Sequence, residues 1–172
     1  SIWIHTSGSM PIDVFRTYTT NYGVLYPFQT FSKNRDISWT TIPVFIEASN
    51  DKSLQTINRI AKSLSENVSE LSSERRRYVH LTGVFACNFT NHMYALSQIF
   101  LQKANLPLEA VLPLIDETAS KVHTLSPKEA QTGPAVRYDE NVIKKHLELI
   151  GDEDVKHIYK IISEHIHKLN QE

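Results

Sequence analysis

Residues 73–104 restrict the fold of this chain more than any other segment, because they contain no proline and only one glycine, Gly83. A single helix over this range would be roughly 45 Å long at about 1.5 Å per residue. Apolar side chains occur around most of its circumference: Tyr78, Val79, Leu81, Val84, Phe85, Phe89, Met93, Leu96, Ile99 and Phe100. A helix that is apolar on several sides must be covered on several sides. In a chain of 172 residues, we expect a second subunit to supply much of that cover through a two-fold interface.

The residues before this helix alternate between strand and helix patterns. Apolar and β-branched residues predict strands at 2–6, 23–29, 42–48 and 68–71. Apolar residues at helical spacing predict a helix over 51–65, and Pro11 at a first turn predicts another up to about Thr20, capped by Ser9. This alternation is typical of the second half of an α/β sheet. The chain opens directly on a core strand, so we expect further residues upstream.

The last hundred residues are predicted to be helical. Further helices are expected over 107–123, 139–150 and 152–169, the last two divided by Gly151 at a C-cap position. Asp139 and Asp152 are well placed to be the N-caps of these two helices.

Composition excludes several classes of protein. The formal net charge is -1, so no basic surface is expected to attract nucleic acid or an anionic membrane. The basic run 75–77 is interpreted as a solvated helix start rather than a phosphate clamp. Cys87 is the only cysteine, which excludes an internal disulfide and favours a cytoplasmic protein. No stretch is apolar enough to span a membrane.

One stripe of the long helix carries unusual polar residues. His80, Gly83, Cys87, Asn88 and Asn91 fall near one face through steps of three and four. A buried Asn or His that lacks a partner costs several kcal/mol, so each must be satisfied. The stripe is either a set of hydrogen bonds between helices or a surface that faces a ligand, and the residue types leave both open.

A second candidate site lies between two of the later helices. Thr132 and Gly133 precede Pro134 in a turn whose backbone can approach a ligand closely. Arg137 follows, and its guanidinium suits a carboxylate or a phosphate. The alternative is that Arg137 and Asp139 form an ion pair that orders the loop and caps the next helix.

The first strand runs into a small loop of hydroxyl residues, HTSGS. Such a loop at the carboxyl end of a strand is where α/β sheets bind ligands, although an ordinary turn explains it equally well. The segment YPFQTF holds the matching place after the next strand. No GxGxxG motif, P-loop or nucleophile elbow occurs, and no metal site is expected, since His165 and His167 lie on different helix faces.

These residues carry a resemblance to a known family. The stretches HTSGS, LYPFQTFSK, LSSERRRYVHLTGVFACNFTNHMYAL and LSPKEAQTGPAVRYDENVIKKHLELI resemble an uncharacterised Rossmann-like family that has a C-terminal domain of unknown function. Its members are described as NADP-dependent oxidoreductases. More distantly, the chain is similar to 6-phosphogluconate and β-hydroxyacid dehydrogenases, ketopantoate reductase and pyrroline-5-carboxylate reductase.

The resemblance implies a domain plan. Residues 1–72 would be the second half of a Rossmann-like sheet, without its first strands and glycine-rich loop. Residues 73–172 would be an all-α substrate and dimerisation domain of the 6-phosphogluconate dehydrogenase C-terminal type. Ser7, Gly8 and Ser9 would border the nicotinamide of NADP or NAD. The pyrophosphate-binding glycines are not in this sequence, so we expect the chain as given to bind NADP weakly or not at all.

The resemblance also implies catalytic positions. Gly83 and Asn91 match the Gly and Asn that flank a catalytic Lys in the β-hydroxyacid dehydrogenases, and Cys87 stands at the Lys position. A thiol cannot supply that positive charge, so their mechanism is not carried over. Asn91, Asn88 and His80 are the predicted catalytic residues, with Asn91 orienting the substrate. Arg137, Asp139, Thr132 and Gly133 are the predicted substrate-binding residues. The alternative to an oxidoreductase is a non-catalytic module that dimerises or senses a ligand.

Overall fold

The structure is a computed structural model that describes residues 1–171. Its contacts divide the chain into two compact units, Ser1–Phe100 and a second unit that begins at Leu101. The predicted domain division between residues 72 and 73 stays a prediction.

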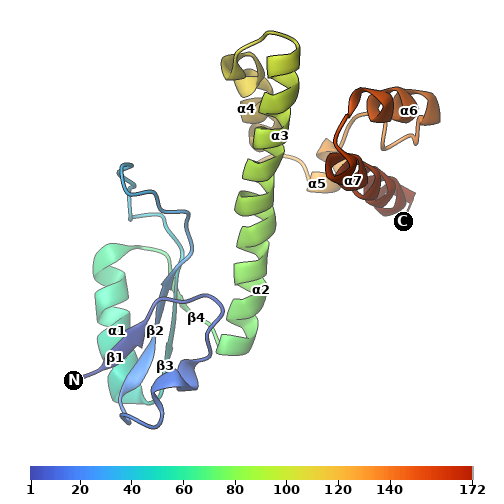
Figure 1. Ribbon diagram of the computed structural model, residues 1–172. Coiled ribbons are helices and arrows are strands. Elements are labelled where there is room, and N and C mark those ends of the chain that lie inside the picture. The colour runs from blue at the N-terminus through green and yellow to red at the C-terminus, as the bar shows by residue number, and fades with distance from the viewer. Residues whose placement is uncertain (172) are drawn as a thin grey trace. The chain divides into compact units, whose positions relative to one another are not determined.

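The first unit is built on a mixed sheet of four strands (Figure 1). The strands are β1 (Trp3–His5), β2 (Tyr22–Pro27), β3 (Val44–Ala48) and β4 (Val68–Glu70), in the order β1-β2-β3-β4. β1 and β2 are parallel, β2 and β3 are antiparallel, and β3 and β4 are parallel. All four predicted strands are therefore present, and the antiparallel central pair makes the sheet mixed.

Helix α1 (Asp51–Leu64) covers one face of this sheet, as the spacing of its apolar residues predicts. Asn50 caps the helix by accepting a hydrogen bond from the Ser53 backbone N–H. The buried cluster at this contact comprises Leu25, Val44, Ile46, Ile57 and Ala61. Gly23 lets β2 lie this close, because a Cβ there would overlap the Ile57 side chain and the Glu47 backbone oxygen.

The helix predicted from Pro11 to Thr20 is wrong. Only one short 3-10 turn forms, η1 (Ile12–Phe15), and no side chain caps it, so Ser9 is not an N-cap. Thr17, Thr19 and Thr20 explain why the helix stops, because β-branched hydroxyl residues compete for backbone groups. Thr19 does so here: its hydroxyl oxygen accepts a hydrogen bond from the Asn21 N–H at 3.1 Å.

The long helix is confirmed, with a local change of winding. α2 (Ser73–Gly83) passes through a π-helical turn, η2 (Val84–Phe89), into α3 (Thr90–Lys103) without a break in the helical ribbon (Figure 1). Ser72 caps the start by accepting a hydrogen bond from the Arg75 N–H. Single π turns are rare and occur often at functional sites.

The second unit is helical, as predicted. After the short 3-10 turn η3 (Leu108–Val111) it contains α4 (Leu112–Lys121), α5 (Pro127–Ala130), α6 (Glu140–Leu149) and α7 (Glu153–Gln171). Asp139 and Asp152 are both confirmed as N-caps: each accepts a hydrogen bond from the N–H three residues on, at 3.2 and 3.0 Å. Gly151 does not adopt the left-handed conformation of a C-cap glycine, since α6 ends on extended backbone at Ile150.

Candidate active site

A pocket of about 370 Å³ lies in the first unit, between the residues that end and follow β2 and one face of the long helix. The segment YPFQTF and the polar stripe of the long helix both contribute to it. Its lining residues are Tyr26, Phe28, Gln29, Thr30, His80, Gly83, Val84, Ala86, Cys87 and Asn88. Aromatic walls with a few convergent polar groups are typical of a small-molecule site.

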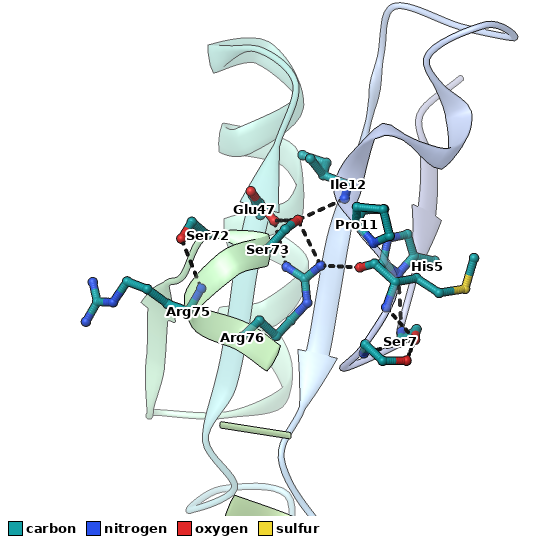
Figure 2. Close-up of polar contacts among 11 residues, drawn as sticks. His5, Ser7, Pro11, Ile12, Glu47, Ser72, Ser73, Arg75 and Arg76 are labelled. Atoms are coloured by element: carbon teal, nitrogen blue, oxygen red, sulfur yellow. Dashed lines mark hydrogen bonds and ion pairs between the residues drawn. The ribbon is translucent and has the colours of Figure 1, made fainter. Parts of the chain in front are cut away.

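A buried charge pair fixes the helix that forms one wall of this pocket (Figure 2). The Arg76 side chain is 1 % exposed and donates hydrogen bonds of 2.6 Å to the Glu47 carboxylate and to the Met10 carbonyl oxygen. Ser73 joins the same network, donating to Glu47 at 2.7 Å and accepting from the Ile12 N–H at 2.8 Å. The start of α2 is thereby attached to β3 and to the segment that follows β1.

The interpretation of residues 75–77 as a solvated helix start is therefore wrong for Arg76. It is the largest fully buried side chain among the described residues, whereas Arg75 and Arg77 are exposed. The helix presents position 76 to the sheet, and Glu47 on β3 supplies the opposite charge that permits burial.

The loop after β1 holds itself together. Ser7 Oγ accepts hydrogen bonds from the N–H groups of Ser9 and Met10, at 3.3 and 3.2 Å, and the Ser7 N–H donates to His5 Nδ1 at 3.2 Å. Gly8 is buried at the centre of this loop. Burial also lowers the pKa of His5 below its ordinary value of 6.5.

Gly8 touches a polar pair at the end of the pocket. The Tyr26 hydroxyl and His80 Nδ1 are hydrogen-bonded at 3.3 Å. A Cβ on Gly8 would lie 2.7 Å from His80 Nδ1 and 2.8 Å from the Tyr26 hydroxyl. Burial raises the pKa of Tyr26, partly opposed by the charge of Arg76. The predicted cofactor loop and the predicted catalytic His80 thus lie in contact.

The rest of the polar stripe follows along the same face of the helix. Gly83 leaves room for the Phe28 ring, whose Cε2 would lie 2.9 Å from an added Cβ. Cys87 and Asn88 line the pocket beyond it. Asn91 lies one turn farther along α3 and is not a lining residue. Asn88 and Asn91 are exposed, and within residues 1–171 their side chains form no hydrogen bond.

The second predicted site lies in the second unit. Gly133 adopts a φ of +103°, which glycine accommodates without strain, and the side chain of Asp139 is occupied in capping α6. Arg137 is exposed and forms no ion pair with Asp139 within the described part of the chain. The substrate-binding roles of Thr132, Gly133, Arg137 and Asp139 stay predictions.

Sequence reasoning missed three residues of this site: Tyr26, Glu47 and Arg76. A signal existed for Glu47, because it is the one charged residue in the apolar strand IPVFIEA. A carboxylate in such a strand requires a partner. Tyr26 stood in a segment recognised as equivalent to the first loop, but nothing in the sequence paired it with His80.

Within residues 1–171, no group of three or more His, Cys, Asp or Glu side chains is arranged to hold a metal ion. Over the same residues, no helix is both long enough and apolar enough to cross a membrane.

A small mixed sheet followed by several helices, with a pocket along the first long helix, defines an α/β architecture with a helical continuation. The sequence profile of a family described as a domain of unknown function, DUF2520, matches residues 42–166. The chain belongs to the DUF2520 family.

Solved structures that resemble the chain include proteins from Bacteroides fragilis and Thermotoga maritima. The crystal structure of the putative NADP oxidoreductase BF3122 from Bacteroides fragilis matches with a TM-score of 0.93 and 51% identity, over 96% of this chain and 64% of that one. This chain therefore spans less than two thirds of that protein. Protein TM1727 from Thermotoga maritima has the same fold, with a TM-score of 0.77 and 20% identity over 99% of this chain and 69% of that one. A comparison with curated proteins gave no match.

Proposed function

We propose that this chain is part of an oxidoreductase that uses NADP or NAD to reduce or oxidise a small carbonyl, imine or hydroxyl compound. In this proposal the sheet unit is the second half of a Rossmann-like domain. The long helix opens a helical domain of the 6-phosphogluconate dehydrogenase C-terminal type. Similarity to a protein whose name includes NADP oxidoreductase supports this assignment.

One observation carries the proposal. The loop containing Ser7, Gly8 and Ser9 contacts Tyr26 and His80 at one end of a pocket whose other residues are aromatic, amide and thiol side chains. In open α/β sheets, ligands bind beyond the carboxyl ends of the strands, where this loop lies. A cofactor edge beside the loop and a substrate in the pocket would therefore meet.

The residues of this chain fit the edge of a dinucleotide rather than its centre. The N–H groups of Ser9 and Met10 are already directed at Ser7 Oγ, so the loop does not provide a set of free donors for a pyrophosphate. The exposed hydroxyl of Thr6 remains available at its surface, whereas the Ser9 hydroxyl is hydrogen-bonded to Ser7 Oγ at 3.4 Å. When bound, the nicotinamide would supply or accept the hydride.

Within the pocket, Asn88 is suited to orient a substrate oxygen through its amide, and His80 to exchange a proton. Asn91 lies one helical turn beyond Asn88, so it could contact only a part of the substrate that extends past the pocket. Cys87 contributes a small, weakly polar surface where β-hydroxyacid dehydrogenases have a lysine.

The proposal is tested by screening the longest natural form of the protein for nicotinamide oxidation with panels of keto acids, imines and hydroxy acids. We expect turnover with at least one class, reduced about 10-fold to 100-fold by Asn88→Ala, which removes one substrate hydrogen bond. Asn141→Ala, at an exposed position of α6 that does not line the pocket, is the matched control. Absence of turnover with every class would contradict the proposal.

The exposed apolar face of the long helix favours a second role, which does not require catalysis. Tyr78, Leu81, Phe85 and Phe89 are between 50% and 71% exposed. They lie on the side of the helix opposite Arg76 and His80, and the rings of Phe85 and Phe89 pack edge to face, 5.1 Å apart. This face supports a homodimer, either as the frame of an enzyme or as a dimerising module that has lost the reaction.

A further inference from the structure

The proposed reaction needs a proton donor that the lysine position no longer supplies. Reducing a carbonyl forms one C–H bond from a hydride and one O–H bond from a proton as the C=O π bond breaks. None of the ten residues that line the pocket is Asp, Glu, Lys or Arg. The acidic protons in the lining therefore belong to Tyr26, His80 and Cys87.

Position separates these three groups. Tyr26 and His80 both lie against Gly8, in the middle of the loop that would border the cofactor. Cys87 lies seven residues beyond His80, roughly 10 Å farther along the helix axis at about 1.5 Å per residue. A carbon that receives a hydride beside the Ser7–Ser9 loop would be near the Tyr26–His80 pair and away from the thiol.

We infer that the Tyr26 hydroxyl donates the proton to the carbonyl oxygen or imine nitrogen of the substrate, and that His80 replaces that proton through their hydrogen bond. The inference rests on the proposed function. The electron pair of the breaking π bond takes the phenol proton, the phenolate oxygen takes the Nδ1 proton of the imidazolium, and solvent protonates His80 again. Oxidation of an alcohol would follow the same route in reverse.

The surroundings keep the phenol protonated and neutral at physiological pH. Burial raises the pKa of Tyr26, and Arg76, whose charge opposes that shift, is paired with Glu47. The titratable and charged groups around the pair are His5 on β1, Glu47 on β3, Arg76 on α2 and Cys87 on η2.

The hydrogen bond between the pair makes the availability of the phenol hydrogen depend on which ring nitrogens of His80 carry a proton. When His80 carries both ring protons, Nδ1–H donates to the Tyr26 oxygen and the phenol hydrogen is free for the substrate. When His80 is neutral, the phenol hydrogen bonds to bare Nδ1 and is withheld.

The pairing can be measured without any substrate. ¹⁵N NMR of the His80 ring in the longest natural form should show the neutral imidazole protonated at Nε2, because the phenol donates to Nδ1. Tyr26→Phe should shift the tautomer population, whereas Tyr18→Phe, which removes a hydroxyl from a side chain 73% exposed and outside the pocket, should not. An unchanged His80 spectrum in Tyr26→Phe would overturn the inference.

Kinetics test the catalytic role. With a substrate from the screen, Tyr26→Phe should lower kcat about 10²-fold or more and leave KM within about threefold. His80→Gln, which removes the group that returns the proton to Tyr26, should lower kcat about 10-fold or more, whereas the exposed His157→Gln should leave it unchanged. A Tyr26→Phe enzyme within about threefold of the parent kcat contradicts this inference alone. A parent protein that oxidises no nicotinamide contradicts the proposed function, and the catalytic role falls with it.

Discussion

Arg76 carries a positive charge where water cannot reach it. Its guanidinium donates to a carboxylate, a carbonyl oxygen and a hydroxyl, and only Nε is left without a partner among the described residues. Replacing one member of a buried pair leaves the other charge uncompensated, which costs about 3–5 kcal/mol. The same network holds α2 against the loop that touches the pocket, so it connects stability with the geometry of the site.

We therefore expect Arg76→Ala to lower the free energy of unfolding by about 3–5 kcal/mol in urea titrations. Arg75→Ala and Arg77→Ala, one residue away on exposed faces, should each change it by less than about 0.5 kcal/mol. The double variant Arg76→Met with Glu47→Leu should recover much of the loss, because it removes both charges. Equal effects at positions 75, 76 and 77 would contradict the buried pair.

His5 predicts a dependence of stability on pH. Burial lowers its pKa in the folded chain below the ordinary 6.5, so the unfolded chain binds a proton first as the pH falls. The contribution of His5 is therefore complete above about pH 6.5 and is lost as the pH falls below that value toward the folded pKa. His5→Gln should flatten this part of the stability curve relative to the parent, and NMR titration of the ring should give a midpoint below 6.5. A midpoint above 6.5 would contradict the direction of the shift.

At the residue scale, the sequence predicted some partners and missed others for a clear reason. Asp139 and Asp152 were predictable as caps because a cap bonds to an N–H only three residues away. Arg76 was not predictable, because its partner Glu47 lies 29 residues earlier on a different element. Which of three consecutive arginines faces a sheet depends on packing that helical spacing alone does not define.

At the scale of elements, the long helix was predictable and its winding was not. A run of 32 residues without proline defines a helix, but nothing in VFACNF distinguishes a π turn from an α turn. The four strands were predictable from β-branched runs, whereas the antiparallel pairing of β2 and β3 was not. The sixteen residues between these two strands carry no pattern that specifies whether β3 runs parallel or antiparallel to β2.

Gly83 marks the place where α2 passes the pocket wall, and it yields a prediction about this element. Gly83→Ala should gain about 1 kcal/mol of helix propensity and lose a similar amount by pressing on Phe28, so the free energy of unfolding should change by less than about 1 kcal/mol. The Phe28 ring should move toward the pocket, as a crystal structure of the variant would show. Gly151→Ala, where nothing lies within 4 Å of the new Cβ, should move no neighbour. An unmoved Phe28 ring would contradict the contact.

At the scale of the whole molecule, the apolar face of the long helix predicts self-association. Tyr78, Leu81, Phe85 and Phe89 would form the centre of an interface of roughly 1,200–2,000 Å². Sedimentation of the parent chain should show a dimer. The double variant Leu81→Glu with Phe85→Glu should be monomeric, because dimerisation would bury two unpaired carboxylates from each copy in the interface. Ile60→Glu, an equivalent change on the exposed side of α1, should leave the dimer intact. A parent chain that stays monomeric at high concentration would contradict the interface.

The affinity of the whole chain for NADP depends on a pyrophosphate-binding loop. Pyrophosphate is normally bound by N–H groups of a glycine-rich loop at a helix N-terminus, and no such motif occurs in these 172 residues. The loop after β1 does not substitute for it, since Ser7 Oγ already accepts from two of its N–H groups. Two charge-assisted hydrogen bonds are worth about 3 kcal/mol or more, which corresponds to at least about 100-fold in affinity. Calorimetry should therefore show weak or undetectable NADP binding to this chain, and binding at least about 100-fold tighter to a form of the protein that includes the glycine loop. A dissociation constant in the low micromolar range for this chain alone would mean that residues 1–172 hold the dinucleotide by contacts other than the glycine loop.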